Sequence, residues 1–64
     1  MVIQNQEDFS RATITGGATA AQIIRAMQDV PGDAWINEFE IEYDYTGNEP
    51  FPVSFKAAVE WVKQ

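Results

Sequence analysis

The sequence predicts an α+β fold: a single small domain spanning residues 1–64, in the order β-α-β-β, with one helix packed on a three-stranded sheet. Three observations predict it. Residues 38–45 alternate acidic with large apolar side chains, which is the period of a strand. Residues 19–30 have the period of an amphipathic helix. Residues 9–15 are rich in β-branched side chains, as strands are.

Length and composition limit how such a chain can be stabilised. A chain of 64 residues buries roughly 60% of the surface that its unfolded form exposes, and its net stability is on the order of 3–5 kcal/mol. The sequence has no Cys and no His, so neither a disulfide framework nor a zinc site can hold it together. Stability must come from apolar side chains, with self-association as a further contribution.

Charge excludes some partners and favours others. The chain has ten acidic and four basic residues, a net charge of -6. Seven of the acids lie between positions 29 and 49, where there is no Lys or Arg: Asp29, Asp33, Glu38, Glu40, Glu42, Asp44 and Glu49. This pattern disfavours direct nucleic-acid binding and an anionic membrane surface. The N-terminal segment lacks the features of a signal peptide, and no apolar run is long enough to span a membrane. We therefore expect a cytoplasmic protein.

The first strand is predicted over Phe9–Thr15 and stops at a pair of glycines, Gly16-Gly17. Its alternation places Ala12 and Ile14 on one face, and Arg11 and Thr13 on the other. Residues 1–8 are mostly polar and are expected to form a mobile lead-in. The alternative for Val2-Ile3 is an extension of a sheet edge.

The helix begins with a capping box, Thr19-Ala20-Ala21-Gln22, in which each terminal side chain accepts from the backbone amide of the other. Pro31-Gly32 is expected to end it, because proline disfavours helical geometry at the preceding residue. One apolar face is predicted, comprising Ala20, Ile23, Ile24, Met27 and Val30.

The central strand is predicted over Trp35–Tyr45 and has two faces of opposite character. The apolar face consists of Phe39, Ile41, Tyr43 and Tyr45, and we expect the helix and the last strand to cover it. The acidic face consists of Glu38, Glu40, Glu42 and Asp44. That face is expected to meet either water or a cationic partner.

The last segment, residues 51–64, follows a turn at residues 46–50 and fits a strand better than a helix, although the helix remains an alternative. As a strand it forms a hairpin with the central strand, placing Lys56 among the glutamates and Phe55 and Trp61 beside the apolar face. A right-handed crossover makes the first two strands parallel. The last strand then lies antiparallel between them.

The candidate site is a surface for binding another protein. On a strand, alternate residues lie roughly 6.5–7 Å apart, similar to the phosphates of a nucleic-acid strand. The acidic row could therefore imitate a nucleic-acid backbone; the alternative is an ordinary solvated sheet face. Trp35 and Phe51 flank the hairpin and are candidates for exposed aromatic anchors. The candidate partner-binding residues are Glu38, Glu40, Glu42, Asp44, Trp35 and Phe51.

No motif in the sequence predicts catalysis, a cofactor or a metal. Gly16-Gly17 lacks the remaining residues of a phosphate-binding loop. Residues 44–49 resemble part of a calcium loop, but Gly47 is at the fourth position of the pattern instead of the sixth. We expect no catalytic, cofactor-binding or metal-binding residues.

Residues 18–34, with the turn Val30-Pro31-Gly32-Asp33-Ala34 and the later Val59-Glu60-Trp61, resemble small accessory proteins of actinobacterial phages and their hosts. The resemblance implies a phage origin, a location in the host cytoplasm and no enzyme activity, and it carries over no functional residues. The expected function is therefore non-catalytic protein–protein binding. The alternatives are a nucleic-acid mimic that inhibits a DNA- or RNA-binding host factor, and a structural or homo-oligomeric phage component.

Overall fold

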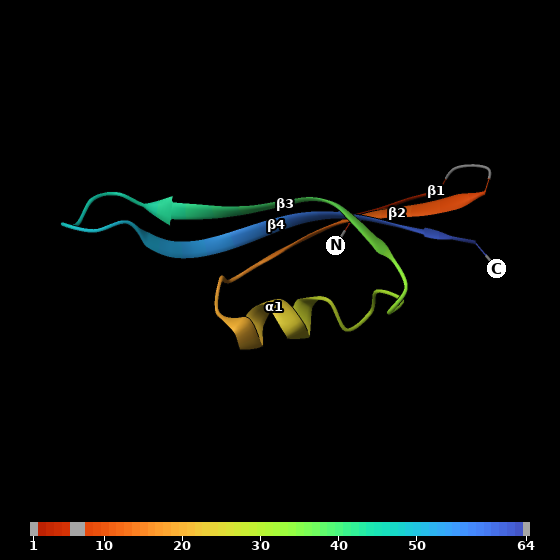
Figure 1. Ribbon diagram of the computed structural model, residues 1–64, viewed down its shortest axis with the longest axis horizontal. Coiled ribbons are helices and arrows are strands. Elements are labelled where there is room, and N and C mark those ends of the chain that lie inside the picture. The colour runs from red at the N-terminus through yellow and green to blue at the C-terminus, as the bar shows by residue number, and fades with distance from the viewer. Residues whose placement is uncertain (1, 6–7, 64) are drawn as a thin grey trace.

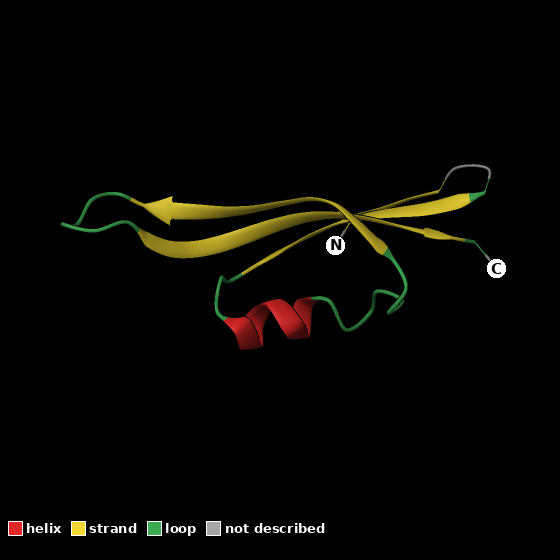
Figure 2. Cartoon of the chain, in the orientation of Figure 1, coloured by secondary structure: helices red, strands yellow, loops and turns green. Residues whose placement is uncertain are grey.

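The computed structural model of the chain describes residues 2–5 and 8–63. One helix lies on one face of a four-stranded antiparallel sheet whose strand order is β1-β2-β4-β3 (Figures 1 and 2). The α+β class and the order of the strand, helix, strand and strand that form the core are confirmed. The elements are β1 (Val2–Asn5), β2 (Phe9–Gly16), α1 (Ala20–Ala26), β3 (Trp35–Asp44) and β4 (Phe51–Val62).

The three strands β2, β4 and β3 have the predicted topology, and β1 is a fourth strand beyond the three predicted. β4 pairs with β2 on one side and with β3 on the other, and both pairings are antiparallel. β2 and β3 therefore run parallel to each other, with the last strand between them. The strand interpretation of residues 51–64 is confirmed for β4. β1 pairs antiparallel with the outer edge of β2, which realises the sheet-edge alternative. Residues 1–8 were expected to be mobile, but Val2–Asn5 form a strand. Residues 1, 6 and 7 lie outside the described residues.

The core is small and lies between the helix and the two middle strands. Its fully buried side chains are Ala12, Ile14, Phe55, Ala57 and Val59. Those packed against them and partly buried are Ile23, Ala26, Met27, Val30, Ile41 and Trp61. The predicted alternation of β2 is confirmed, because Ala12 and Ile14 are buried while Arg11 is exposed.

The helix begins as predicted and ends earlier. The Gln22 amide donates to the Thr19 hydroxyl at 3.1 Å, and the Thr19 amide donates to the Gln22 side chain at 3.2 Å, which confirms the capping box. The helix stops at Ala26, before the Pro31-Gly32 signal. The Val30 amide then donates to the Met27 carbonyl at 3.0 Å in a separate turn. That turn provides hydrogen-bond partners for the backbone groups without a further helical turn, and it places Val30 against the core.

Ile24 does not belong to the buried face of the helix, contrary to the prediction. Its side chain is 64% exposed, whereas Ile23, Ala26 and Met27 pack on the sheet. Successive residues of a helix differ by about 100° around its axis. Only one narrow side of the seven-residue helix α1 contacts the sheet. The apolar face of the helix is therefore narrower than the sequence predicts.

The apolar face of β3 is covered only in part, contrary to the prediction. Ile41 packs against the core, and the Phe39 ring stacks on that of Phe55 with centroids 5.9 Å apart. Phe39 and Tyr43 nevertheless remain about half exposed, and Tyr45 lies beyond the end of the strand and is largely exposed. The reason is visible in Figure 1, where the β3–β4 hairpin extends well past the end of the helix. No part of α1 lies over that end of the hairpin.

A conservative pair of substitutions tests where the core ends. Ile14→Val removes a buried methylene, and we expect it to lower the free energy of unfolding by about 0.5–1.5 kcal/mol. The matched control Ile24→Val removes the same group from an exposed site and should change stability by less than about 0.5 kcal/mol. Urea unfolding followed by tryptophan fluorescence measures both. Equal losses for the two variants would contradict this placement of the core.

Candidate functional site

The pairing of β3 with β4 brings the six predicted partner-binding residues to one face of the hairpin. Side chains at directly opposed positions of antiparallel strands point to the same side. Alternation along β3 joins Glu38, Glu40, Glu42 and Asp44, and Asp44 is opposed by Phe51. We call this surface the acidic face; its members are Trp35, Glu38, Glu40, Glu42, Asp44 and Phe51. It lies on the side of the sheet opposite to the helix.

Trp35 joins this face because of an irregularity in β3. Ile36 is opposed by Val59 and Glu38 by Ala58, so Asn37 is an extra residue that forms a β-bulge. Without the bulge, Trp35 would share a side with Phe39. With it, Trp35 is opposed by Glu60, whose side of β4 carries the outward-facing residues. Nothing in the sequence marks Asn37 as a bulge, and sequence reasoning missed this change of side.

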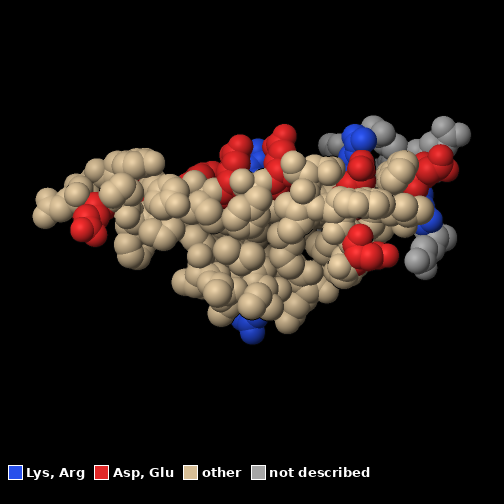
Figure 3. Space-filling view, in the orientation of Figure 1, with Lys and Arg blue, Asp and Glu red and all other residues tan. Residues whose placement is uncertain are grey.

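Glu38, Glu40 and Glu42 form a row on β3 that we call the glutamate row. Their carboxylates are not neutralised by close cationic partners. Among the described residues, the one ion pair joins Arg11 Nε to Glu60 Oε2 at 2.5 Å, on the neighbouring strands β2 and β4. Lys56 is opposed to Glu40, as predicted, but forms no ion pair within 4.0 Å in the described part of the chain. Figure 3 shows several acidic side chains on the side of the sheet away from the helix, with a single cation among the central ones. The face therefore carries net negative charge.

Arg11 and Glu60 were missed as a pair by sequence reasoning. The strand period alone places each of them on an outward face. Their contact depends on the register of β2 against β4, in which Arg11 is opposed by Glu60. No local sequence signal specifies that register. In this pair the charges of Arg11 and Glu60 neutralise each other on the strands next to Trp35.

Asp44 differs from the three glutamates of the row. Its Oδ1 accepts from the Thr46 amide at 2.9 Å and from the Thr46 hydroxyl at 2.7 Å. These two hydrogen bonds, the backbone one first, hold the pKa of the Asp44 carboxyl below its ordinary value. Asp44 is committed to the turn that follows β3. The freely presented row therefore consists of Glu38, Glu40 and Glu42.

Two exposed aromatic side chains lie near the two ends of this row. Trp35, at the start of β3, is 55% exposed, and Phe51, opposed to Asp44 at the end of β3, is 67% exposed. Single exposed apolar side chains are common on protein surfaces, but aromatic residues are enriched among the residues that dominate binding at protein interfaces. The acidic face thus has an anionic middle and an apolar anchor at each end.

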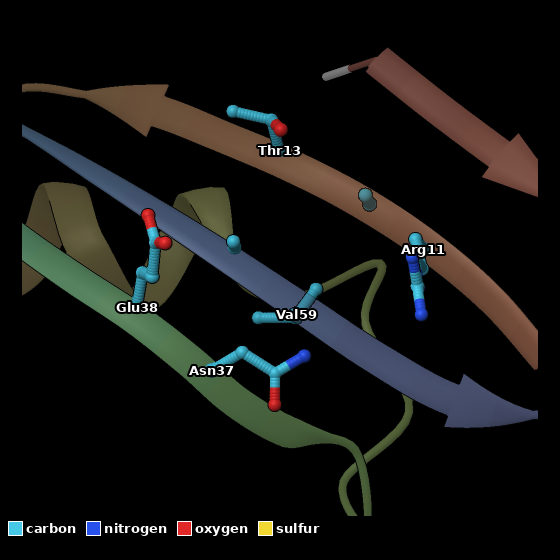
Figure 4. A pocket seen from close by; sticks show the side chains of 7 residues that line it. Arg11, Thr13, Asn37, Glu38 and Val59 are labelled. Atoms are coloured by element: carbon cyan, nitrogen blue, oxygen red, sulfur yellow. The ribbon is translucent and has the colours of Figure 1, made fainter.

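A shallow hollow of about 260 Å³ adjoins Glu38. It forms because the small Ala58 of β4 lies between the longer Glu38 of β3 and Thr13 of β2, with which it is in register. Figure 4 shows Arg11 and Thr13 on one side of β4, and Asn37 and Glu38 on the other. The hollow is smaller than the roughly 300–1,000 Å³ of typical ligand sites. It is large enough for one side chain of a partner.

The described residues offer no metal site or membrane span. No three of their Asp and Glu side chains lie close enough together to hold a metal ion. In the same part of the chain, no helix has the length and apolar character needed to cross a membrane.

Comparison with known proteins adds no assignment. A scan against protein-family models, a search of curated proteins and a search of solved structures each returned no match.

The Asp44–Thr46 contact predicts a measurable pKa. In an NMR pH titration, the pKa of the Asp44 carboxyl should lie below its ordinary value, and Thr46→Val, which removes the hydroxyl donor, should raise it partway. Because folding lowers this pKa, the stability it contributes is present at neutral pH and is lost as the pH falls through the folded-state value. Thr46→Ser keeps the hydroxyl and should leave the pKa low. An unchanged pKa in Thr46→Val would contradict the role of the hydroxyl.

Proposed function

We propose that this chain is a non-catalytic protein-binding module whose binding surface is the acidic face. One observation carries the proposal. The strand register and the bulge at Asn37 place Trp35, the glutamate row and Phe51 on one exposed side of a single hairpin. The partner that fits is a protein with a basic strip between two apolar pockets. Electrostatic attraction would steer the encounter, and the two aromatic rings would supply most of the affinity.

The non-catalytic part of the proposal is supported by the exposure of the carboxylates. Acid–base catalysis by two carboxylates needs them in different environments, so that one is protonated and the other is ionised. Glu38, Glu40 and Glu42 are all exposed and lie in equivalent positions on one strand. Such a row suits recognition better than proton transfer.

The biological setting is a separate part of the proposal. The resemblance of Val30–Ala34 and of Val59-Glu60-Trp61 to small phage accessory proteins supports a phage-type accessory protein acting in the host cytoplasm. In that setting the partner would be a host or phage protein.

A second candidate function is mimicry of a nucleic acid. It is favoured by the spacing of the free carboxylates, because alternate residues on a strand lie roughly 6.5–7 Å apart, close to successive phosphates. Asp44 stays ionised but holds one carboxylate oxygen in hydrogen bonds to Thr46, so Glu38, Glu40 and Glu42 are the freely presented members of this row. A mimic would depend on the glutamates and would not need the aromatic rings. That difference separates the two candidates.

The aromatic anchors give the first test. Immobilised protein would be used to capture partners from a lysate of the host cell, with mass spectrometry to identify and quantify them. Once a partner is identified, we expect the double variant Trp35→Ala/Phe51→Ala to weaken its binding by at least about 30-fold, because truncation of aromatic side chains that anchor an interface costs about 2 kcal/mol or more.

The control for this experiment is Ile24→Ala, which truncates an equally exposed apolar side chain on the helix. It should leave the affinity unchanged. A partner whose binding survives Trp35→Ala/Phe51→Ala would contradict the role of the aromatic anchors.

Charge gives the second test. Glu40→Gln/Glu42→Gln removes two charges from the acidic face, whereas Asp29→Asn/Asp33→Asn removes two from the exposed segment after the helix. We expect only the first variant to weaken partner binding, measured by calorimetry, and we expect added salt to weaken wild-type binding. Equal effects of the two variants would show that net charge, and not the acidic face, determines binding. Loss of binding in the glutamate variant, without loss in the aromatic variant, would favour the mimic.

A further inference from the structure

A second surface lies on the opposite side of β3 and takes no part in the acidic face. It is an apolar row on the helix side of the strand, which we call the β3 stripe: Ile36, Phe39, Ile41 and Tyr43. The bulge at Asn37 brings Ile36 into this row, opposite the core residue Val59. Ile36 is 59% and Tyr43 is 45% exposed. No member of the stripe is charged.

The helix is too short to cover this stripe. Seven residues of α-helix are about 10 Å long, whereas the ten residues of β3 extend about 34 Å. The helix packs on the core residues of β2 and β4, and β3 is the outer strand of the sheet. The far half of the β3–β4 hairpin has no layer over it (Figure 1).

The chain as a whole exposes more surface than a compact monomer of its mass, by an amount similar to one side of a protein interface. The chain exposes 4973 Å², whereas a compact monomer of 7.2 kDa exposes about 4,100 Å². Its radius of gyration is 13.6 Å, compared with about 11 Å for a compact domain of this length. The excess area is roughly 850 Å², and a standard interface buries about 800 Å² on each partner.

We propose that the β3 stripe is the interface of a homodimer, in which the stripes of two copies pack face to face about a two-fold axis. Such an interface must be self-complementary, because the same patch meets itself. An apolar row without charges meets that condition. The carboxylates of both copies stay on the outer sides, in water, so dimer formation does not bury them.

The alternative pairing of two copies, edge to edge through β3, is disfavoured by charge. It would extend the acidic faces of the two copies into one surface, with the glutamates of one β3 beside those of the other. Like charges at opposed positions of neighbouring strands are destabilising. The glutamates thus block edge pairing and leave the helix-side face as the route to self-association.

Layer spacing is compatible with the face-to-face arrangement. Two packed sheets lie about 10 Å apart, and a helix with its side chains is about 10–12 Å in diameter. A partner hairpin placed on the β3 stripe would therefore lie in the same layer as α1. Each copy would supply the cover that the other lacks, and the Tyr43 hydroxyl can reach water at the rim.

Neighbouring residues on opposite sides of β3 give a matched test by sedimentation equilibrium. We expect wild-type protein to have twice the mass of the chain at micromolar concentrations. Ile36→Glu and Tyr43→Glu each place a charge in the interface and should weaken dimerisation at least about tenfold. The control Trp35→Glu makes a comparable change one residue away, on the acidic face, and should remain dimeric. Far-ultraviolet circular dichroism checks that the variants are folded.

Two results would overturn the proposal: a wild-type protein that is monomeric up to about 100 μM, well above a micromolar dissociation constant, or a dimer that survives both Ile36→Glu and Tyr43→Glu. Contacts in a mixed-isotope NMR sample decide the geometry. Side-chain contacts between the Tyr43 and Phe39 rings of different copies are expected, and Hα–Hα contacts between two β3 strands would instead show edge pairing and overturn it.

The dimer and the proposed function can fail separately. Added salt should strengthen the dimer, because it screens the repulsion between two chains of net charge -6, whereas it should weaken partner binding at the acidic face. Trp35→Glu should lose the partner and keep the dimer. Ile36→Glu should do the reverse.

Discussion

The mismatch between a short helix and long strands governs the rest of this structure. Seven helical residues cover one patch of the sheet, where Ile14, Phe55 and Val59 are fully enclosed. Gly16 allows the end of β2 to approach the Phe55 ring so closely that a Cβ there would lie 3.2 Å from it. Beyond this patch the hairpin continues without a second layer. A compact core and an extended two-stranded arm result, with overall dimensions of 47 × 19 × 15 Å.

The sequence predicted β2, α1, β3 and β4 well because each carries a local signal. The Thr19–Gln22 capping box, the alternation of residues 38–44 and the turn at 46–50 depend on residues near one another in the chain. The order of the strands followed from one general rule, the handedness of the crossover. The helix end was wrong because proline marks where a helix cannot continue, and the chain had already left the helix at Ala26.

The surfaces were predictable only in part. Alternation identified the glutamate row, but the position of Trp35 and the burial of the apolar face depend on non-local facts. One is the bulge at Asn37, which changes the side of every residue before it. The other is the length of the helix relative to the hairpin. Alternation indicates that one side of β3 needs cover, and it contains no information on whether the same chain provides it.

The bulge has a consequence for comparing this chain with related sequences. The extra residue Asn37, between Ile36 and Glu38, determines which side of the sheet Trp35 and Ile36 face. A relative that lacks this residue would exchange the two sides at the start of the strand while keeping every other side chain in place. A one-residue gap at this position in an alignment would therefore mark an exchange of the side chains that face the two sides of the sheet, whereas the same gap in the 46–50 turn would mark only a different loop length.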